Sequence, residues 1–216
     1  MFTIFRHMWY RDRKEDYMNL RRTILTALFA ALLVAGAYVA IPVGPVPVTL
    51  QTAFVLLVGM LCGSKLAATS VAVYLALGAI GLPVFSGGVG GFAHFAGPTG
   101  GFLISWLVAA PLAGFCTDIG FRGTSRSADE QVTRRQLLWM IAGAVSGTLV
   151  LYAIGLPIMK FVLNLSWPQA FAVGLIPFLP GDLVKLVAVI LLGNMFANRV
   201  RTFLAEEQLE EAATDE

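Results

Sequence analysis

The sequence predicts an all-α integral membrane protein with six transmembrane helices and both termini in the cytoplasm. Of its 216 residues, 57% are hydrophobic and 13% are charged, and the mean hydropathy is +0.77. A soluble domain carries roughly 25% charged residues, so this composition indicates a chain that lies mostly in lipid. Long apolar stretches recur between charged or Gly- and Pro-rich segments, and the basic residues are segregated along the chain.

The apolar stretches predict six spans: 23–41, 50–63, 65–82, 100–117, 136–157 and 173–197. The second and third are short, because about 20 residues are needed to cross a bilayer core of about 30 Å. They are expected to tilt little or to be partly re-entrant within the bundle. The first stretch has an apolar length of about 19 residues, longer than the roughly 7–15 of a signal peptide, so a retained helix is expected.

The basic residues predict the orientation of these spans. Of the 15 Lys and Arg residues, only Lys160 falls on the outer side and Lys185 lies in the last span, while the other 13 fall on the inner side. The expected organisation is a basic cytoplasmic segment (1–22), a membrane domain (23–200) and an acidic cytoplasmic tail (201–216).

Neither terminal segment resembles a packed domain. Six of the 15 Lys and Arg residues lie in 1–22, and six of the 13 Asp and Glu residues lie in 206–216. The basic segment fits contact with anionic membrane lipid or a role in setting topology. Met18 is a plausible alternative start, which would make 1–17 an extension. No basic–aromatic pattern suggests nucleic acid.

The most informative pair of residues is Asp182 and Lys185, which lie inside the last apolar stretch. A charge in hydrocarbon costs at least a few kcal/mol and persists where it faces a partner, a ligand or a water-filled cavity. Three residues apart on a helix, the two side chains share a face. The pair therefore predicts a site for a small polar or zwitterionic molecule, with an internal salt bridge as the alternative.

The outer segments predict a cover over that site. Residues 78–101 contain nine of the 22 glycines, and 41–48 contain three prolines. Apolar loops of this kind fold back compactly, and Asp182 and Lys185 lie near the same outer end. A binding pocket in the outer leaflet is therefore expected.

Several uncharged residues are further candidates for the pocket. Gln51 offers two donors and an acceptor, with hydrogen bonds between helices as the alternative. Thr99 lies in the Gly97–Gly101 turn and is suited either to capping the fourth span or to a ligand contact. His94 is a candidate polar contact, with a surface role as the alternative. Aromatic residues are expected as pocket walls or interfacial anchors: Tyr74, Phe85, Phe92, Phe95 and Trp106.

No motif supports an enzyme. Gly88–Ala93 matches G-x-G-x-x-A without a preceding strand, and Gly59–Lys65 lacks the order of a P-loop. There is no visible ATPase, nucleophile elbow or metal cluster, and no cofactor is expected. Cys62 and Cys116 are expected to be small packing residues.

The first span carries a stripe of small residues at Ala27, Ala31 and Ala35. Such stripes let another helix approach closely. They indicate either packing within the chain's own bundle or docking of a partner membrane subunit.

Four segments together resemble the BioY family, the biotin-binding S components of energy-coupling factor (ECF) vitamin transporters. They are Val46–Thr52, Tyr74–Gly88, Gly97–Gly101 and Pro180–Lys185. The resemblance implies a six-helix S-component fold in the cytoplasmic membrane of a prokaryote, with an outward-facing biotin pocket. It also implies a membrane-embedded T component and two ATPase subunits as partners, although some family members occur without them.

The resemblance also implies roles for particular residues. Asp182 and Lys185 match the Asp and Lys that contact the ligand in the family, and Ala27 and Ala31 match the surface that meets the T component. An Asn expected near the third loop is absent from 83–99, and His94 is the candidate for that role. The competing interpretations are a stand-alone carrier for biotin or a similar small acid, and a purely structural membrane subunit.

Overall fold

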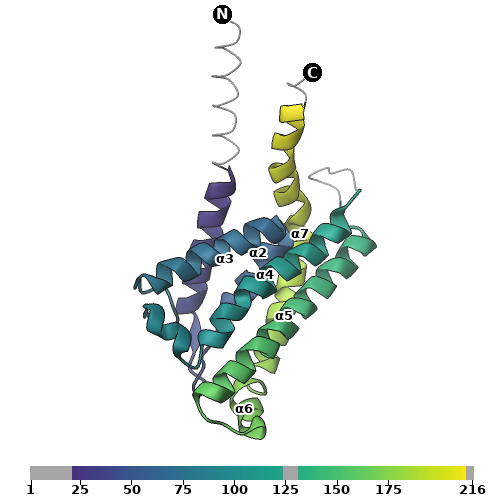
Figure 1. Cartoon of the computed structure of the whole chain (residues 1–216). Helices are drawn as coiled ribbons and strands as arrows, with labels where there is room; N and C mark the ends of the chain where they lie inside the picture. Colours follow the sequence, from purple (N-terminus) through teal and green to yellow (C-terminus); the bar gives the residue numbers. More distant parts are fainter. Residues whose placement is uncertain (1–20, 124–130, 213–216) are drawn as a thin grey trace, which may run out of the picture.

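The computed structural model describes residues 21–123 and 131–212, with side chains as far as residue 204 (Figure 1). The elements, in chain order, are an N-terminal helix (Arg21–Tyr38), β1 (Ala40–Ile41), β2 (Val48–Thr49), α2 (Gln51–Cys62), α3 (Ser64–Ala79), the 3-10 helix η1 (Phe92–Ala96), α4 (Gly100–Phe121), α5 (Arg134–Val162), α6 (Trp167–Gly174) and α7 (Leu179–Ala212). The two strands pair antiparallel, with Ala40 opposite Thr49. Most of the basic segment, the alternative start at Met18 and the last four residues of the acidic tail lie outside the described residues.

The prediction of a helical membrane protein is confirmed. In the part of the chain that the structure describes, four helices are long and apolar enough to cross a membrane: Arg21–Tyr38, Gly100–Phe121, Arg134–Val162 and Leu179–Leu204. The second and third predicted spans form helices of 12 and 16 residues. At 1.5 Å per residue these are ~18 Å and ~24 Å long, which is less than the ~30 Å core of a bilayer.

The short length of α2 follows from its place inside the protein. Its residues 55–61 are buried without interruption, and a helix that is apolar all round belongs in a core. The helix contacts α3, α4, α5 and α7. Because its surroundings are protein, its length does not have to match the thickness of the lipid.

The predicted sixth span, 173–197, is wrong at its start. Residues 175–178 form turns that separate α6 from α7, which begins at Leu179. Pro177 lacks an N–H and pushes Ile176 away from helical geometry, so the helix stops before it. Pro180 is tolerated in the first turn of α7, where no intrahelical N–H bond is required. Helix α7 also runs past residue 200, the predicted boundary of the tail.

Helices α4 and α5 lie side by side along their length (Figure 1). Their close approach depends on small residues, as in many membrane bundles. A Cβ atom added at Gly143 of α5 would lie 2.7 Å from the carbonyl oxygen of Ala113 on α4. One at Gly147 would lie 2.5 Å from Cδ2 of Leu56 on α2. Larger residues here would therefore push three helices apart.

A polar cluster joins α2, α4 and α7 at the end of the molecule away from α6. The Arg201 guanidinium donates to the Met60 carbonyl through Nε (3.3 Å) and Nη2 (3.1 Å), and it pairs with Asp118 at 2.8 Å. Asp118 also accepts from the backbone N–H and the hydroxyl of Ser64, each at 3.1 Å. It thereby satisfies the first turn of α3 from a neighbouring helix.

The chain direction is consistent across these elements. Figure 1 shows the start of the N-terminal helix and the end of α7 at one end of the molecule, with α6 at the other end. The hairpin formed by β1 and β2 lies at the same end as α6, and so does the turn before α7. Helices α4 and α7 both begin at this end. The loops that precede α2, α4 and α7 therefore gather at one end of the bundle.

The Arg201 cluster yields a stability prediction. Arg201→Met removes a charged donor from the buried Met60 carbonyl, and we expect it to lower the free energy of unfolding by about 1–3 kcal/mol. The control is Arg122→Met, an exposed residue at the end of α4, which should change stability by no more than about 0.5 kcal/mol. Thermal unfolding of the two variants in detergent measures the difference, and equal losses would contradict the assigned role of Arg201.

Candidate binding site

A cavity of about 270 Å³ lies where α2, α4 and α7 begin and the second half of α5 passes. This volume is near the lower end of the roughly 300–1,000 Å³ of small-molecule sites. The Pro45–Pro47 segment of the hairpin loop lines it, and so does the Gly97–Thr99 segment before α4. The prediction that apolar outer loops contribute to a pocket is therefore supported by the geometry.

Asp182 and Lys185 form the charged part of this cavity. The ammonium Nζ of Lys185 lies 2.8 Å from Oδ1 of Asp182, and both side chains are about nine-tenths buried. Lys185 also donates to the Thr52 hydroxyl at 3.2 Å, and the Tyr152 hydroxyl donates to Oδ2 of Asp182. All four residues line the cavity. The Asp182–Lys185 salt bridge therefore lies in the cavity itself. Through Thr52 and Tyr152, the pair also connects α7 to α2 and α5.

The local sequence of α7 accounts for this orientation. Asp182 lies in the first turn, where a negative charge interacts favourably with the helix dipole. Asp182 and Lys185 occupy one face, while Leu183 and Val184 between them are exposed on the outside of the molecule. In a membrane this exposed apolar face suits lipid, so the polar residues point inward.

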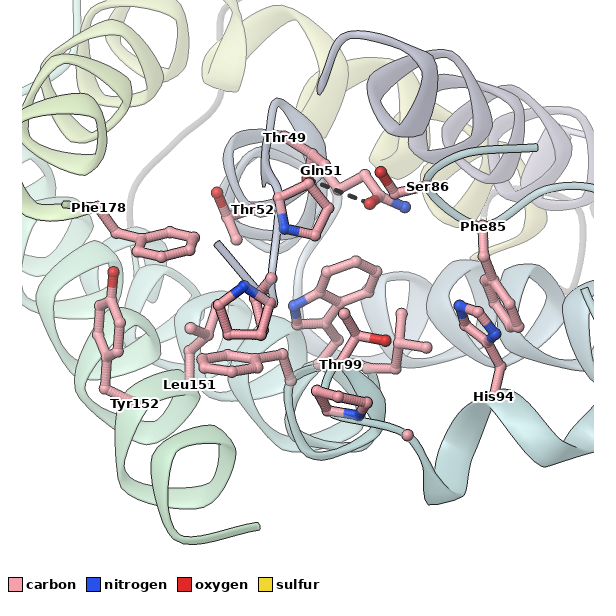
Figure 2. Close-up of a pocket in the computed structure, with 18 of the residues that line it drawn as sticks. Thr49, Gln51, Thr52, Phe85, Ser86, His94, Thr99, Leu151, Tyr152 and Phe178 are labelled. Atoms are coloured by element: carbon pink, nitrogen blue, oxygen red, sulfur yellow. Dashed lines mark hydrogen bonds between the residues drawn. The ribbon is translucent and has the colours of Figure 1, made fainter. Parts of the chain in front are cut away.

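Gln51 begins a chain of hydrogen bonds that leads away from the cavity. Its amide oxygen accepts from the Thr49 hydroxyl at 3.1 Å (Figure 2). Its amide nitrogen donates to the Tyr74 hydroxyl, which in turn donates to the Val84 carbonyl at 3.1 Å. Gln51 is almost fully buried yet lines the cavity, and one of its two N–H donors is not used in these bonds.

Tyr74 therefore lies behind the wall and not on it. It is fully buried and does not line the cavity. Its ring contacts Phe85 edge-on, with centroids 5.7 Å apart, and lies 5.9 Å from the ring of Trp106. Of the predicted ligand contacts, Tyr74 is the one that the structure keeps out of the cavity; it supports two residues, Phe85 and Trp106, that line it.

Phe85 and His94 form the opposite wall. Figure 2 shows them across the cavity from Tyr152 and Phe178, and their rings stack with centroids 5.5 Å apart and planes 18° apart. The Phe85 ring lies directly on the backbone of α3 at Gly78, where an added Cβ would be 2.0 Å from Cζ of Phe85. Only glycine leaves room for this ring, which explains one position in the Gly-rich region.

Thr99 occupies the N-cap position of α4, but its side chain makes no capping hydrogen bond. The expected capping role is therefore not observed, and Thr99 lines the cavity (Figure 2). Of the other aromatic candidates, Trp106 also lines the cavity, whereas Phe92 is strongly exposed and Phe95 packs against the core. Within the described residues, no group of His, Cys, Asp and Glu is arranged to hold a metal.

Sequence reasoning missed Tyr152 and Thr52. Both are hydroxyl residues in apolar helices, where such residues are common and usually bond within the bundle. What distinguishes these two hydroxyls is that they lie next to the charged pair. That proximity depends on how the helices pack and cannot be read from the sequence.

Ala27, Ala31 and Ala35 lie outside the bundle. All three are exposed on one face of the N-terminal helix, whereas Phe29, Ala30 and Leu33 face the core. The alternative of packing within the chain's own bundle is not supported for this stripe, and its role in docking stays a prediction.

A helical membrane bundle that encloses a buried donor–acceptor pair under apolar loops defines a small-molecule-binding membrane protein. The family model described as the BioY family matches residues 11–202. A "Biotin transporter BioY" of Rhizobium etli is 40% identical over 180 residues, covering 82% of this chain and 93% of the relative. One of Thermotoga maritima is 36% identical over 173 residues, covering 80% and 94%.

The structural comparison agrees. The fold is similar, with a TM-score of 0.69 and 29% identity, to a crystal structure of the S-component for biotin from an ECF-type ABC transporter. The likeness covers 85% of this chain and 92% of that one. The chain belongs to the BioY family.

The Tyr152 contact yields a prediction that sequence analysis did not. Tyr152→Phe removes a donor to a charged, buried acceptor, and we expect it to lower the free energy of unfolding by about 1.5–3 kcal/mol. Tyr38→Phe is the matched control, because Tyr38 donates to the Pro83 carbonyl at 2.7 Å from an exposed position. Thermal unfolding should show the smaller loss for Tyr38→Phe, and the reverse order would contradict the assigned bond.

Proposed function

We propose that this protein captures biotin at the outer face of a prokaryotic cytoplasmic membrane, as the substrate-binding S component of an ECF-type transporter. The observation that carries the proposal is the cavity with the Asp182–Lys185 pair. The family membership and the similarity to the S-component for biotin support it. Its homologues are transporter subunits and not enzymes.

The chemistry of the cavity fits the ureido ring of biotin. In that ring an N–H and the carbonyl oxygen are neighbours. Asp182 and Lys185 lie 2.8 Å apart, so they suit adjacent atoms better than the two ends of an extended ligand. We assign a ureido N–H to Asp182 and the ureido carbonyl to Lys185. Phe85, Phe102 and Phe178 supply apolar walls for the thioether ring and the aliphatic chain.

The proposed topology has six membrane helices and both termini in the cytoplasm. The 13 inner basic residues support this orientation, and the start of the N-terminal helix lies at the same end of the molecule as the end of α7 (Figure 1). In this topology α2 and α3 are the two short spans; α2 is enclosed by other helices, whereas α3 keeps one exposed face. The cavity then faces outward.

Transport requires other subunits in this proposal. A membrane-embedded T component and two ATPase subunits would supply the energy for uptake. The exposed Ala27, Ala31 and Ala35 face is the proposed docking surface, because small residues let a partner helix approach closely.

Ligand-dependent thermal unfolding tests the function. Biotin at a thousandfold excess over Kd should stabilise the purified protein by about 4 kcal/mol. Asp182→Asn should reduce that shift strongly, because the acceptor for the ureido N–H is weakened and Lys185 loses its counter-charge. Leu183→Ala, on the exposed face of the same helix turn, is the control and should keep the shift. If wild type shows no shift, the biotin assignment is wrong.

A bulky substitution tests docking. Ala31→Leu should reduce biotin uptake by cells at least about tenfold, because a larger side chain blocks close helix approach. Biotin affinity of the purified variant should stay within about twofold of wild type. Ala142→Leu makes the same change at an exposed position of α5 and should preserve uptake. Wild-type uptake by Ala31→Leu, or by cells without a T component, would contradict coupling through this surface.

A further inference from the structure

Trp106 carries a buried hydrogen-bond donor with no partner in the protein. Its indole Nε1 is inaccessible, and no acceptor lies within reach among the described residues. The side chain is 3% exposed and lines the cavity. Buried indole N–H groups usually have a partner, so an unsatisfied one beside a binding cavity requires an explanation.

We propose that the Trp106 indole N–H is a direct ligand contact that donates to an oxygen atom of the bound molecule. The inference deepens the proposed function and rests on it, because the ligand is taken to be biotin. Nothing in the residue's sequence context distinguishes this donor role from that of an ordinary aromatic wall.

The surroundings of Trp106 keep the indole in place. Its ring lies 5.9 Å from the ring of Tyr74, which is itself held by hydrogen bonds to Gln51 and to the Val84 carbonyl. The neighbouring apolar residues Leu103 and Phe102 also line the cavity. The ring cannot turn its N–H to solvent, and Trp106 lines the cavity. The acceptor in this proposal is therefore an atom of the bound molecule, which must displace neighbouring wall atoms to reach the inaccessible Nε1.

Trp106 and Lys185 have the same position relative to the starts of their helices. Trp106 lies six residues after the start of α4, and Lys185 lies six residues after the start of α7. Both helices begin at the same end of the bundle, so each side chain lies ~9 Å along its helix. Both residues line the same cavity, and the acceptor that we assign to the Trp106 donor is an oxygen of the ligand.

A subtractive variant separates ligand binding from structure. Trp106→Phe removes the N–H and keeps an aromatic ring. Loss of one neutral hydrogen bond should weaken biotin binding about tenfold, measured by isothermal titration. The ligand-free variant loses no protein hydrogen bond, but the smaller ring leaves space in the core, so some loss of thermal stability is expected and affinity is measured on protein shown to be folded. Trp167→Phe changes an exposed residue of α6 outside the cavity, and should leave affinity unchanged.

Dethiobiotin, which lacks the sulfur but keeps the ureido ring and the carboxylate, identifies the acceptor. Trp106→Phe should weaken its binding by the same factor as for biotin. A loss seen with biotin alone would point to the sulfur and overturn the assignment to oxygen. Unchanged biotin affinity in a folded Trp106→Phe protein would overturn the donor role, whereas no biotin binding by wild type would instead defeat the proposed function.

An NMR measurement on the wild-type chain covers the case in which Trp106→Phe does not fold. The four tryptophans give four indole N–H resonances, and Trp139→Phe and Trp167→Phe help to assign them. Biotin should move the Trp106 resonance downfield, as expected when an N–H gains an oxygen acceptor. A Trp106 resonance that stays in place at saturating biotin would contradict the proposal.

Discussion

The ion pair between Asp182 and Lys185 is the constraint on which the rest of the molecule depends. Two charges in the interior of a membrane protein are tolerated when they are close and when their remaining hydrogen-bonding capacity is used. Thr52 and Tyr152 provide that capacity from α2 and α5. The pair can therefore exist only where three helices meet, and this requirement fixes the packing around the cavity.

Helix α7 forms hydrogen bonds with both the first and the last turn of α2, so the two helices are held together along the whole of α2. Lys185 bonds Thr52 in the first turn of α2, and Arg201 bonds the Met60 carbonyl in its last turn. Between these contacts Gly193 packs on Met60, where an added Cβ would lie 2.2 Å from the sulfur. These contacts hold a helix of 12 residues inside the protein, where its length does not have to match the thickness of the lipid. The short second span in the sequence is therefore explained by its enclosure.

The sequence predicted the helical membrane class, the short second and third helices and the location of the charged residues. The length of an apolar stretch and the presence of a charge within it can both be read directly from the residues of that stretch. The start of the last span was predicted wrongly. Hydropathy averaged over a window is little changed by a single proline, whereas Pro177 prevents the helix from continuing through Ile176. Tyr74 was expected on the cavity wall, and Tyr152 was not expected in the site at all. Whether a buried hydroxyl faces a ligand or a neighbouring helix is decided by which residue lies opposite, and that information arises only from packing.

The remaining hydrogen-bonding capacity of the cavity describes its ligand. Lys185 uses two of its three donors, Gln51 uses one of two, and Trp106 uses none within the described residues. Among the described residues that line the cavity, Asp182 is the one charged acceptor. These open donors favour a molecule that presents oxygen atoms to the cavity. A ureido carbonyl together with a carboxylate meets that description, and a purely cationic or apolar ligand does not.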